Sequence, residues 1–201
     1  RARGAGYIDG AYAVSVDPAC PLEVRIMARF FVAALVCSFA LEAQGAITLF
    51  ANLTHDQEPI AGPVTTSTGD PRPLSFGTAT FVLNDAQTAM TMTATIFNID
   101  VTGQQTPDVN DNLLNAHIHV GTAPGTPTFP VRWGFFGTPD NDNNPDQLVV
   151  TPFAAGVGGT FTSVWDAPEG NAGTTLATNL PFILTGLSYI NFHTTQFGGG
   201  E

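Results

Sequence analysis

The chain contains no lysine. Its six basic residues are all arginines, and 17 acidic residues give it a net charge of −11. After residue 45, only Arg72 and Arg132 remain to offset the acidic side chains. DNA, RNA and anionic membranes attract proteins that present a positive surface, so the charge balance argues against all three as partners. It favours the binding of cations instead.

Cysteine is nearly absent as well. The two cysteines, Cys20 and Cys37, both lie within the first 45 residues. A domain formed by residues 46–201 therefore contains no disulfide and no thiolate ligand. Any metal ion bound there needs nitrogen and oxygen ligands.

The first 45 residues divide into an expected upstream extension, 1–26, and an expected export signal, 27–45. Residues 27–45 show the pattern of a secretory signal peptide, with Arg29, an apolar run over 30–41 and small residues within 43–45. The apolar run is shorter than the roughly 20 residues that a permanent membrane span needs. We therefore expect an exported protein, periplasmic or extracellular, without a permanent span. Residues 1–26 show no regular pattern, and we expect a non-native or disordered upstream extension there.

Long helical patterns are lacking in residues 46–201, and short segments alternate apolar and polar residues with a period of two. This is typical of β-strands separated by turns. The sequence predicts one all-β domain over 46–201, an antiparallel Greek-key β-sandwich or barrel. The expected strands are 47–53, 77–83, 89–99, 116–121, 129–136, 147–151, 159–165 and 187–194, and 174–184 is expected to hold a short helix or an irregular connection.

Two of these segments carry three of the four histidines. In 116–121 the apolar residues share one face and His117 and His119 share the other, while in 189–194 His193 lies opposite an apolar face. If the two strands are neighbours, the three imidazoles can converge on one side of the sheet. Histidines at positions i and i+2 of a strand can reach one ion, and a third histidine from the neighbouring strand completes a face of ligands.

The histidine strands, with their order and surroundings, resemble the CHRD domain family, which is named for its occurrence in chordin. The matching segments are 56–59, 77–81, 116–119, 121–127, 189–194 and 200–201, so the resemblance extends over nearly all of 46–201. It implies an exported all-β domain of the kind found in bacterial and animal proteins. The family's final strand continues beyond Gly200 and Glu201, so the resemblance also implies that this chain is truncated at its C-terminus.

The predicted site is a transition-metal centre formed by His117, His119 and His193, in a binding or structural module. Imidazole ligands suit Cu or Zn, and because neutral imidazole binds the ion, affinity should fall below about pH 6.5. The spacing is also similar to that of copper–zinc superoxide dismutases, so a copper-dependent enzyme of that type is an alternative. No Gly-x-Ser-x-Gly motif, cysteine nucleophile or clear pair of acid/base carboxylates indicates hydrolysis, and we expect a module more than an enzyme.

Four further residues are candidates around this centre. Asn191 and Tyr189 share the face of His193, and Glu201 lies close behind them in the chain, so all three are expected to orient or support the ligands. His55 is a candidate fourth ligand. The alternative is a structural network in which half-exposed histidines bond to one another and to Asn191, Tyr189 or Glu201.

A second, weaker pattern points to calcium. Asp140, Asp142, Asn144 and Asp146 stand at alternate positions of one loop, as the oxygen ligands of calcium loops do. However, Pro145 occupies the position where such loops need glycine. A calcium-binding adhesion or matrix protein, with an extracellular protein or matrix partner, is therefore a third possible function. The alternative for these residues is a solvated turn, which Asn and Asp favour.

Overall fold

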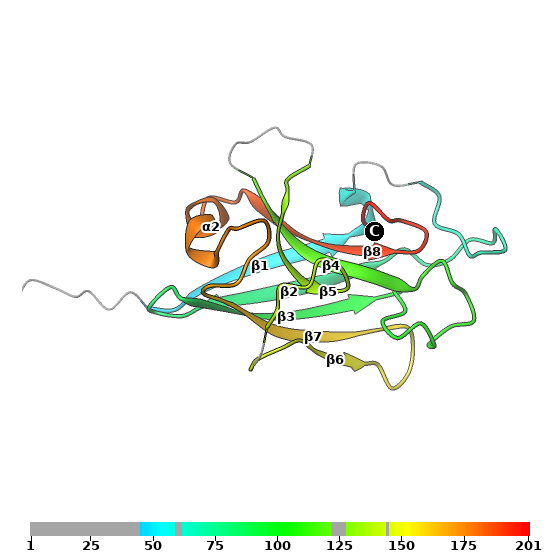
Figure 1. Ribbon diagram of the computed structural model, residues 1–201. Helices are drawn as coiled ribbons and strands as arrows, with labels where there is room; N and C mark the ends of the chain where they lie inside the picture. The colour runs from blue at the N-terminus through cyan, green and yellow to red at the C-terminus, as the bar shows by residue number, and fades with distance from the viewer. Residues whose placement is uncertain (1–44, 59–61, 122–127, 144) are drawn as a thin grey trace, which may run out of the picture. The chain divides into compact units, whose positions relative to one another are not determined.

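The computed structural model describes residues 45–58, 62–121, 128–143 and 145–201 (Figure 1). The predictions for 1–26 and for 27–44 lie outside the described residues. In the described part, eight strands form two antiparallel sheets, with one α-helix and one 3-10 helix (η1, His55–Gln57). The expected all-β sandwich is thereby confirmed.

The larger sheet has five strands in the order β1-β2-β3-β7-β6. Its first three strands are consecutive in the chain and form a meander, whose side chains alternate between a buried and an exposed face as their period of two predicts. The strands are β1 (Ile47–Thr54), β2 (Phe76–Leu83), β3 (Ala89–Phe97), β6 (Val149–Pro152) and β7 (Gly158–Asp166).

The smaller sheet has three strands in the order β5-β4-β8. They are β4 (Leu113–Val120), β5 (Val131–Phe136) and β8 (Ser188–Thr194). In the antiparallel pairing of β4 with β8, His117 faces Asn191 and His119 faces Tyr189. The two histidine strands are therefore neighbours, which confirms the condition on which the predicted convergence of the imidazoles depends.

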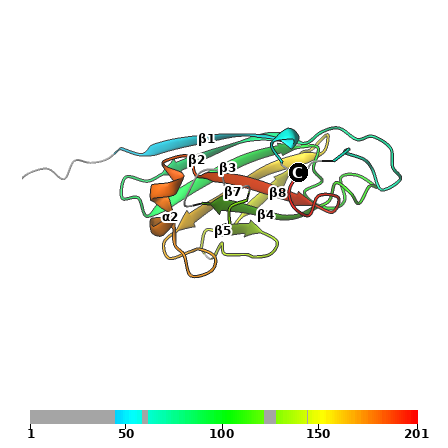
Figure 2. The ribbon, with the colours of Figure 1, turned by 90° about the horizontal axis from the view of Figure 1, so that it is seen from above.

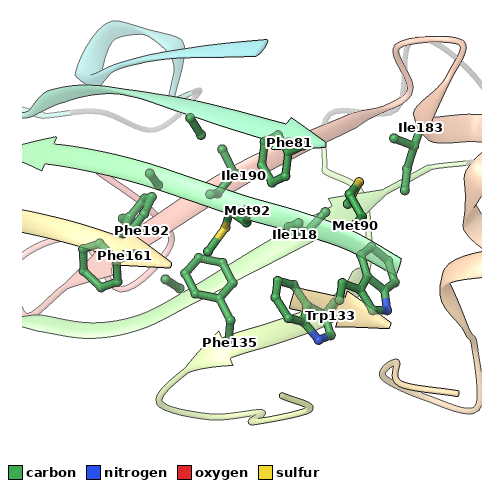
Figure 3. Packing of buried hydrophobic residues seen from close by; sticks show 14 of the residues in the cluster. Phe81, Met90, Met92, Ile118, Trp133, Phe135, Phe161, Ile183, Ile190 and Phe192 are labelled. Atoms are coloured by element: carbon green, nitrogen blue, oxygen red, sulfur yellow. The ribbon is translucent and has the colours of Figure 1, made fainter. Parts of the chain in front are cut away.

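The two sheets pack face to face through aromatic and aliphatic side chains (Figure 3). Trp133 of β5 stacks on Trp165 of β7 with ring centroids 5.6 Å apart, and Phe161 of β7 meets Phe192 of β8 edge to face at 5.3 Å. Burial of such aromatic area is the main stabilising term in a sandwich. This packing holds β4, β5 and β8 in fixed register, so the opposite face of these strands can carry a defined site.

The ends of several elements differ from those expected. β3 stops at Phe97 because Asn98 has a positive φ of 65°, which no strand residue adopts. β4 begins earlier than expected, at Leu113, whose N–H donates to the carbonyl of Asp100 at 2.9 Å. The expected short helix is present as α2 (Leu176–Ile183), which lies at one end of the sandwich (Figures 1 and 2). None of the helices in the described ranges is long and apolar enough to cross a membrane.

Candidate metal centre

The structure brings His117, His119 and His193 together on the face of the smaller sheet that points away from the core. One candidate ligand nitrogen from each ring lies within 4.8 Å of the others. All three side chains are buried, with exposed fractions of 5%, 8% and 8%. Burial on this face was not expected from the sequence, because a strand that alternates apolar and polar residues normally turns its polar face to solvent.

Three backbone carbonyls from surrounding loops fix the proton on each ring. The carbonyl of Thr138 accepts from Nε2 of His117 at 2.9 Å, that of Phe129 from Nδ1 of His119 at 2.7 Å, and that of Gly198 from Nδ1 of His193 at 3.1 Å. A carbonyl oxygen can only accept a hydrogen bond, so each of these nitrogens must carry a hydrogen. In a neutral imidazole the other nitrogen then carries no hydrogen and presents a lone pair.

The remaining three nitrogens consequently present lone pairs to one another. Nδ1 of His117 and Nε2 of His193 are 3.1 Å apart, although neither carries a hydrogen in this tautomeric arrangement. Nε2 of His119 is buried and has no hydrogen-bond partner among the described residues. Uncompensated lone pairs in a buried site are costly. A cation or an added proton among the three nitrogens would remove the cost.

Burial keeps the three rings neutral near pH 7. Burial, followed by the electrostatic effect of the neighbouring His193, lowers the pKa of His117 from 6.5 to about 4. Burial likewise lowers the pKa of His119 and of His193. Neutral imidazole is the form that binds metal ions. A metal ion bound by these rings would therefore lose affinity at a pH lower than about 6.5.

The distance between the two closest nitrogens suits a metal ion. With metal–nitrogen bonds of about 2.0–2.1 Å, two nitrogens 3.1 Å apart subtend an angle of about 100° at the ion, near the tetrahedral value. Nitrogens that share one such ion at tetrahedral angles lie about 3.3–3.4 Å apart. A cluster in which the ligand atoms lie within 4.8 Å would thus have to contract by up to about 1.4 Å to bind.

Tyr189 and Asn191 both border the cluster. The Tyr189 ring stacks on His119 with centroids 4.7 Å apart, and its hydroxyl accepts from the N–H of Phe129, whose carbonyl holds His119. Asn191 donates through Nδ2 to the carbonyl of Gly199 at 3.1 Å, while its Oδ1 is buried and has no partner in the described ranges. Tyr189 therefore restrains His119, and Asn191 restrains the loop after β8.

Glu201 and His55 take other partners. Both carboxylate oxygens of Glu201 accept from the Arg72 guanidinium at 2.6 Å, and Oε2 also accepts from the hydroxyl of Thr194. The His55 ring packs edge to face on Phe197 and does not join the three-histidine cluster. Glu201 supports the cluster indirectly. Its N–H donates to the carbonyl of Phe192, and this hydrogen bond closes the loop that carries Gly198.

Sequence reasoning did not find the three carbonyl groups that orient the histidines. A backbone oxygen has no residue type that would mark it. The nearest signal is glycine: Gly200 has a φ of +131°, and a Cβ there would lie 2.3 Å from the Asn191 amide. A Cβ on Gly134 would lie 1.8 Å from the Pro139 carbonyl and 3.1 Å from the His117 ring. Both glycines allow a loop to pass close to the site.

The predicted calcium residues occupy a different part of the fold. Asp142 is buried and its Oδ2 accepts from the hydroxyl of Ser163 on β7, while Oδ1 of Asp140 accepts from the N–H of Asp142. Asn144 lies outside the described residues. The loop therefore does not place its carboxylates in a row at the surface, because the Asp142 side chain points inward, toward Ser163.

The fold and the cluster together define a β-sandwich domain with three converging histidines. The family model of the CHRD domain matches residues 49–201, and the chain therefore belongs to the CHRD domain family. CHRD domains are typically extracellular or exported binding or structural modules. No curated protein and no solved structure matches the chain.

Proposed function

We propose that the protein is an exported binding or structural module that holds one transition-metal ion, Cu or Zn. The ligands are Nδ1 of His117, Nε2 of His119 and Nε2 of His193. The observation that carries this proposal is the orientation of the rings: each gives its hydrogen to a backbone carbonyl, so three lone pairs face one another. This is the usual way in which metal-binding histidines are oriented.

The chemistry of the donors favours Cu or Zn over other ions. Three imidazole nitrogens are borderline ligands, which suit these metals better than the hard cations Ca and Mg. Three protein ligands leave a further position for water, a substrate or a group from a partner. A redox enzyme would need copper as the bound ion, with that further position open to substrate, so superoxide dismutation is a separate property that the loaded protein must be assayed for.

The test is a titration of the metal-depleted chain with Cu(II) and with Zn(II), followed by calorimetry and by elemental analysis after dialysis. The variants are His117→Ala, His119→Ala and His193→Ala, singly and combined. His55→Ala is the matched control, because His55 is buried like the others but lies outside the cluster. We expect one ion per chain in the wild type and in the control, and none in the triple variant.

Equal, weak binding by the wild type and the triple variant would contradict the proposal. The copper-loaded protein is then compared with the triple variant in a superoxide assay. Activity lost in the triple variant would make the centre catalytic, and an inactive loaded protein would leave it as a binding or structural centre.

A further inference from the structure

A second cluster of acidic groups lies where the loop after β5 meets the loop after β7. The loop after β5 contributes Asp142 and Asp146, and the loop after β7 contributes Glu169, with Asp166 at the end of β7. Asp142 and Glu169 are deeply buried, with exposed fractions of 4% and 6%. Two buried carboxyl groups at one place are unusual, because burying a charge is costly unless it is paired.

Glu169 is held rigidly in this cluster. Its Oε2 accepts from Nε1 of Trp133 at 3.1 Å, and its Oε1 accepts from the N–H of Asn143 at 2.6 Å. Its backbone carbonyl accepts from Nε1 of Trp165 at 2.8 Å. The two stacked tryptophans of the core thus fix one carboxylate between the loops.

Asp142 is only half satisfied. Its Oδ2 accepts from Ser163 and the N–H of Leu148 lies near the carboxylate, but its Oδ1 is buried and makes no hydrogen bond of normal geometry in the described part of the chain, and neither does Oδ1 of Asp146. The four acidic groups lie near enough to influence one another: Asp146 acts on Asp142 and Asp166, and both of these act on Glu169. Burial, as the largest cause, and these neighbours raise the pKa of Asp142 and of Glu169.

No side chain supplies the missing positive charge. The chain has no lysine, and the ion pair between Arg72 and Glu201 is the one found within the described ranges. Arg132, although it lies on β5 next to Trp133, makes no ion pair with any described residue. The cluster therefore has two buried oxygens that lack a partner and four acidic groups that lack a counter-charge.

We propose that Asp142 and Asp146 bind a Ca²⁺ ion through their free Oδ1 atoms, with Glu169 and Asp166 adding negative charge beside it. Carboxylate oxygens with no nitrogen or sulfur donor suit a hard cation, and Ca²⁺ tolerates irregular sites completed by backbone carbonyls and water. Among the described residues only the histidines bring three side-chain ligands within 4.8 Å of one another.

This site differs from the one that the sequence pattern suggested. The pattern used alternate positions of a single loop, whereas the cluster joins two loops and relies on Glu169 and Asp166, which lie more than 15 residues further along the chain. It also differs from the histidine centre in donor chemistry, so each site can fail without the other.

The test measures Ca²⁺ binding to the metal-depleted full chain by calorimetry and by the shift in melting temperature between EGTA and CaCl₂ buffers. The variant is Asp142→Asn, which removes the charge and keeps the shape. The matched control is Asp85→Asn, which removes the same charge from the exposed β2–β3 turn. We expect CaCl₂ to raise the melting temperature of the wild type and the control, and Asp142→Asn to weaken binding at least tenfold.

No calcium-dependent shift in the wild type, or equal dissociation constants for Asp142→Asn and Asp85→Asn, would overturn the proposal. If Asp142→Asn does not fold, the partly exposed Asp146→Asn is measured instead against the same two outcomes. The triple histidine variant should bind Ca²⁺ as the wild type does. A loss of Ca²⁺ binding in that variant, while it remains folded, would place the ion at the histidines and overturn the proposal as well.

Discussion

Acidification provides a direct test of how the histidine cluster is protonated in the metal-free protein. Burial, together with the neighbouring His193 and His119, lowers the pKa of His117 to about 4, whereas in the unfolded chain it is near 6.5. Between these two pH values the unfolded state binds a proton that the folded state does not. The free energy of unfolding must therefore fall as the pH drops from about 6.5 to about 4, and it is unaffected by this group above that window.

The size of the effect follows from the shift. One pKa unit corresponds to about 1.4 kcal/mol, so a shift from 6.5 to about 4 destabilises the folded state by at most about 3 kcal/mol at pH 4. His119 and His193 act in the same direction, because burial lowers the pKa of each. Buried carboxyls such as Asp142, whose pKa is raised, act in the opposite direction, so the histidine contribution must be isolated by difference.

The assay is urea unfolding of metal-depleted wild type and His117→Ala at half-unit intervals from pH 7.5 to pH 4. The difference in unfolding free energy between the two proteins should shrink by about 3 kcal/mol across this range. His55→Ala serves as the control for the loss of a buried histidine outside the cluster. A constant difference between wild type and His117→Ala would show that the ring is not held neutral, and it would refute the lone-pair argument for the metal centre.

Three substitutions test the surroundings of the cluster. Tyr189→Ala should weaken Zn(II) binding about tenfold in calorimetry, since the stacked ring that restrains a ligand is lost, while Tyr189→Phe should retain binding. Arg72→Met should lower the free energy of unfolding by about 3–5 kcal/mol in urea, because it leaves Glu201 buried and unpaired; an unchanged midpoint would contradict this. Gly200→Ala should cost about 1–3 kcal/mol, because it forces a positive φ on alanine and a clash with Asn191; wild-type stability would show that the loop adapts freely.

The period of two in the sequence was enough to predict the strands and the shared face of His117 and His119. It succeeded because each strand has one apolar face that packs in the core, so the position of the other face follows from geometry. It could not show that loops cover that other face. The carbonyls of Thr138 and Phe129 reach His117 and His119 only because each loop follows a particular course in the folded protein. That course depends on tertiary structure, which the local sequence pattern does not reveal.

The predicted calcium loop shows a second limit of prediction from the sequence pattern. Spacing alone treated Asp140, Asp142 and Asp146 as equivalent members of one ladder. The structure separates them, because Ser163 on the inner face of β7 draws Asp142 between the sheets. A serine in an otherwise apolar strand face is the residue that could have revealed this, since a buried hydroxyl needs a partner.

The two proposed sites share the loop after β5, and this leads to one further prediction. Thr138, whose carbonyl holds the proton of His117, lies four residues before Asp142. Between them, Asn141 is tied to Gly134 by two hydrogen bonds, its N–H to the Gly134 carbonyl at 2.7 Å and the Gly134 N–H to its Oδ1 at 3.2 Å. A Ca²⁺ ion bound at Asp142 would therefore also restrain the carbonyl that orients a proposed metal ligand.

Restraint of a ligand before binding reduces the entropy that binding must remove, so Ca²⁺ should tighten Zn(II) binding by about fivefold, the lower end of ordinary coupling. The measurement is Zn(II) calorimetry in CaCl₂ and in calcium-free buffer, with Asp142→Asn as the variant in which the difference should vanish. Because coupling between binding sites is reciprocal, Zn(II) should raise the affinity for Ca²⁺ by the same factor. Equal Zn(II) affinities in the two buffers would show that the Asn141–Gly134 hydrogen bonds already hold Thr138 in place, so that the two ends of the loop are independent.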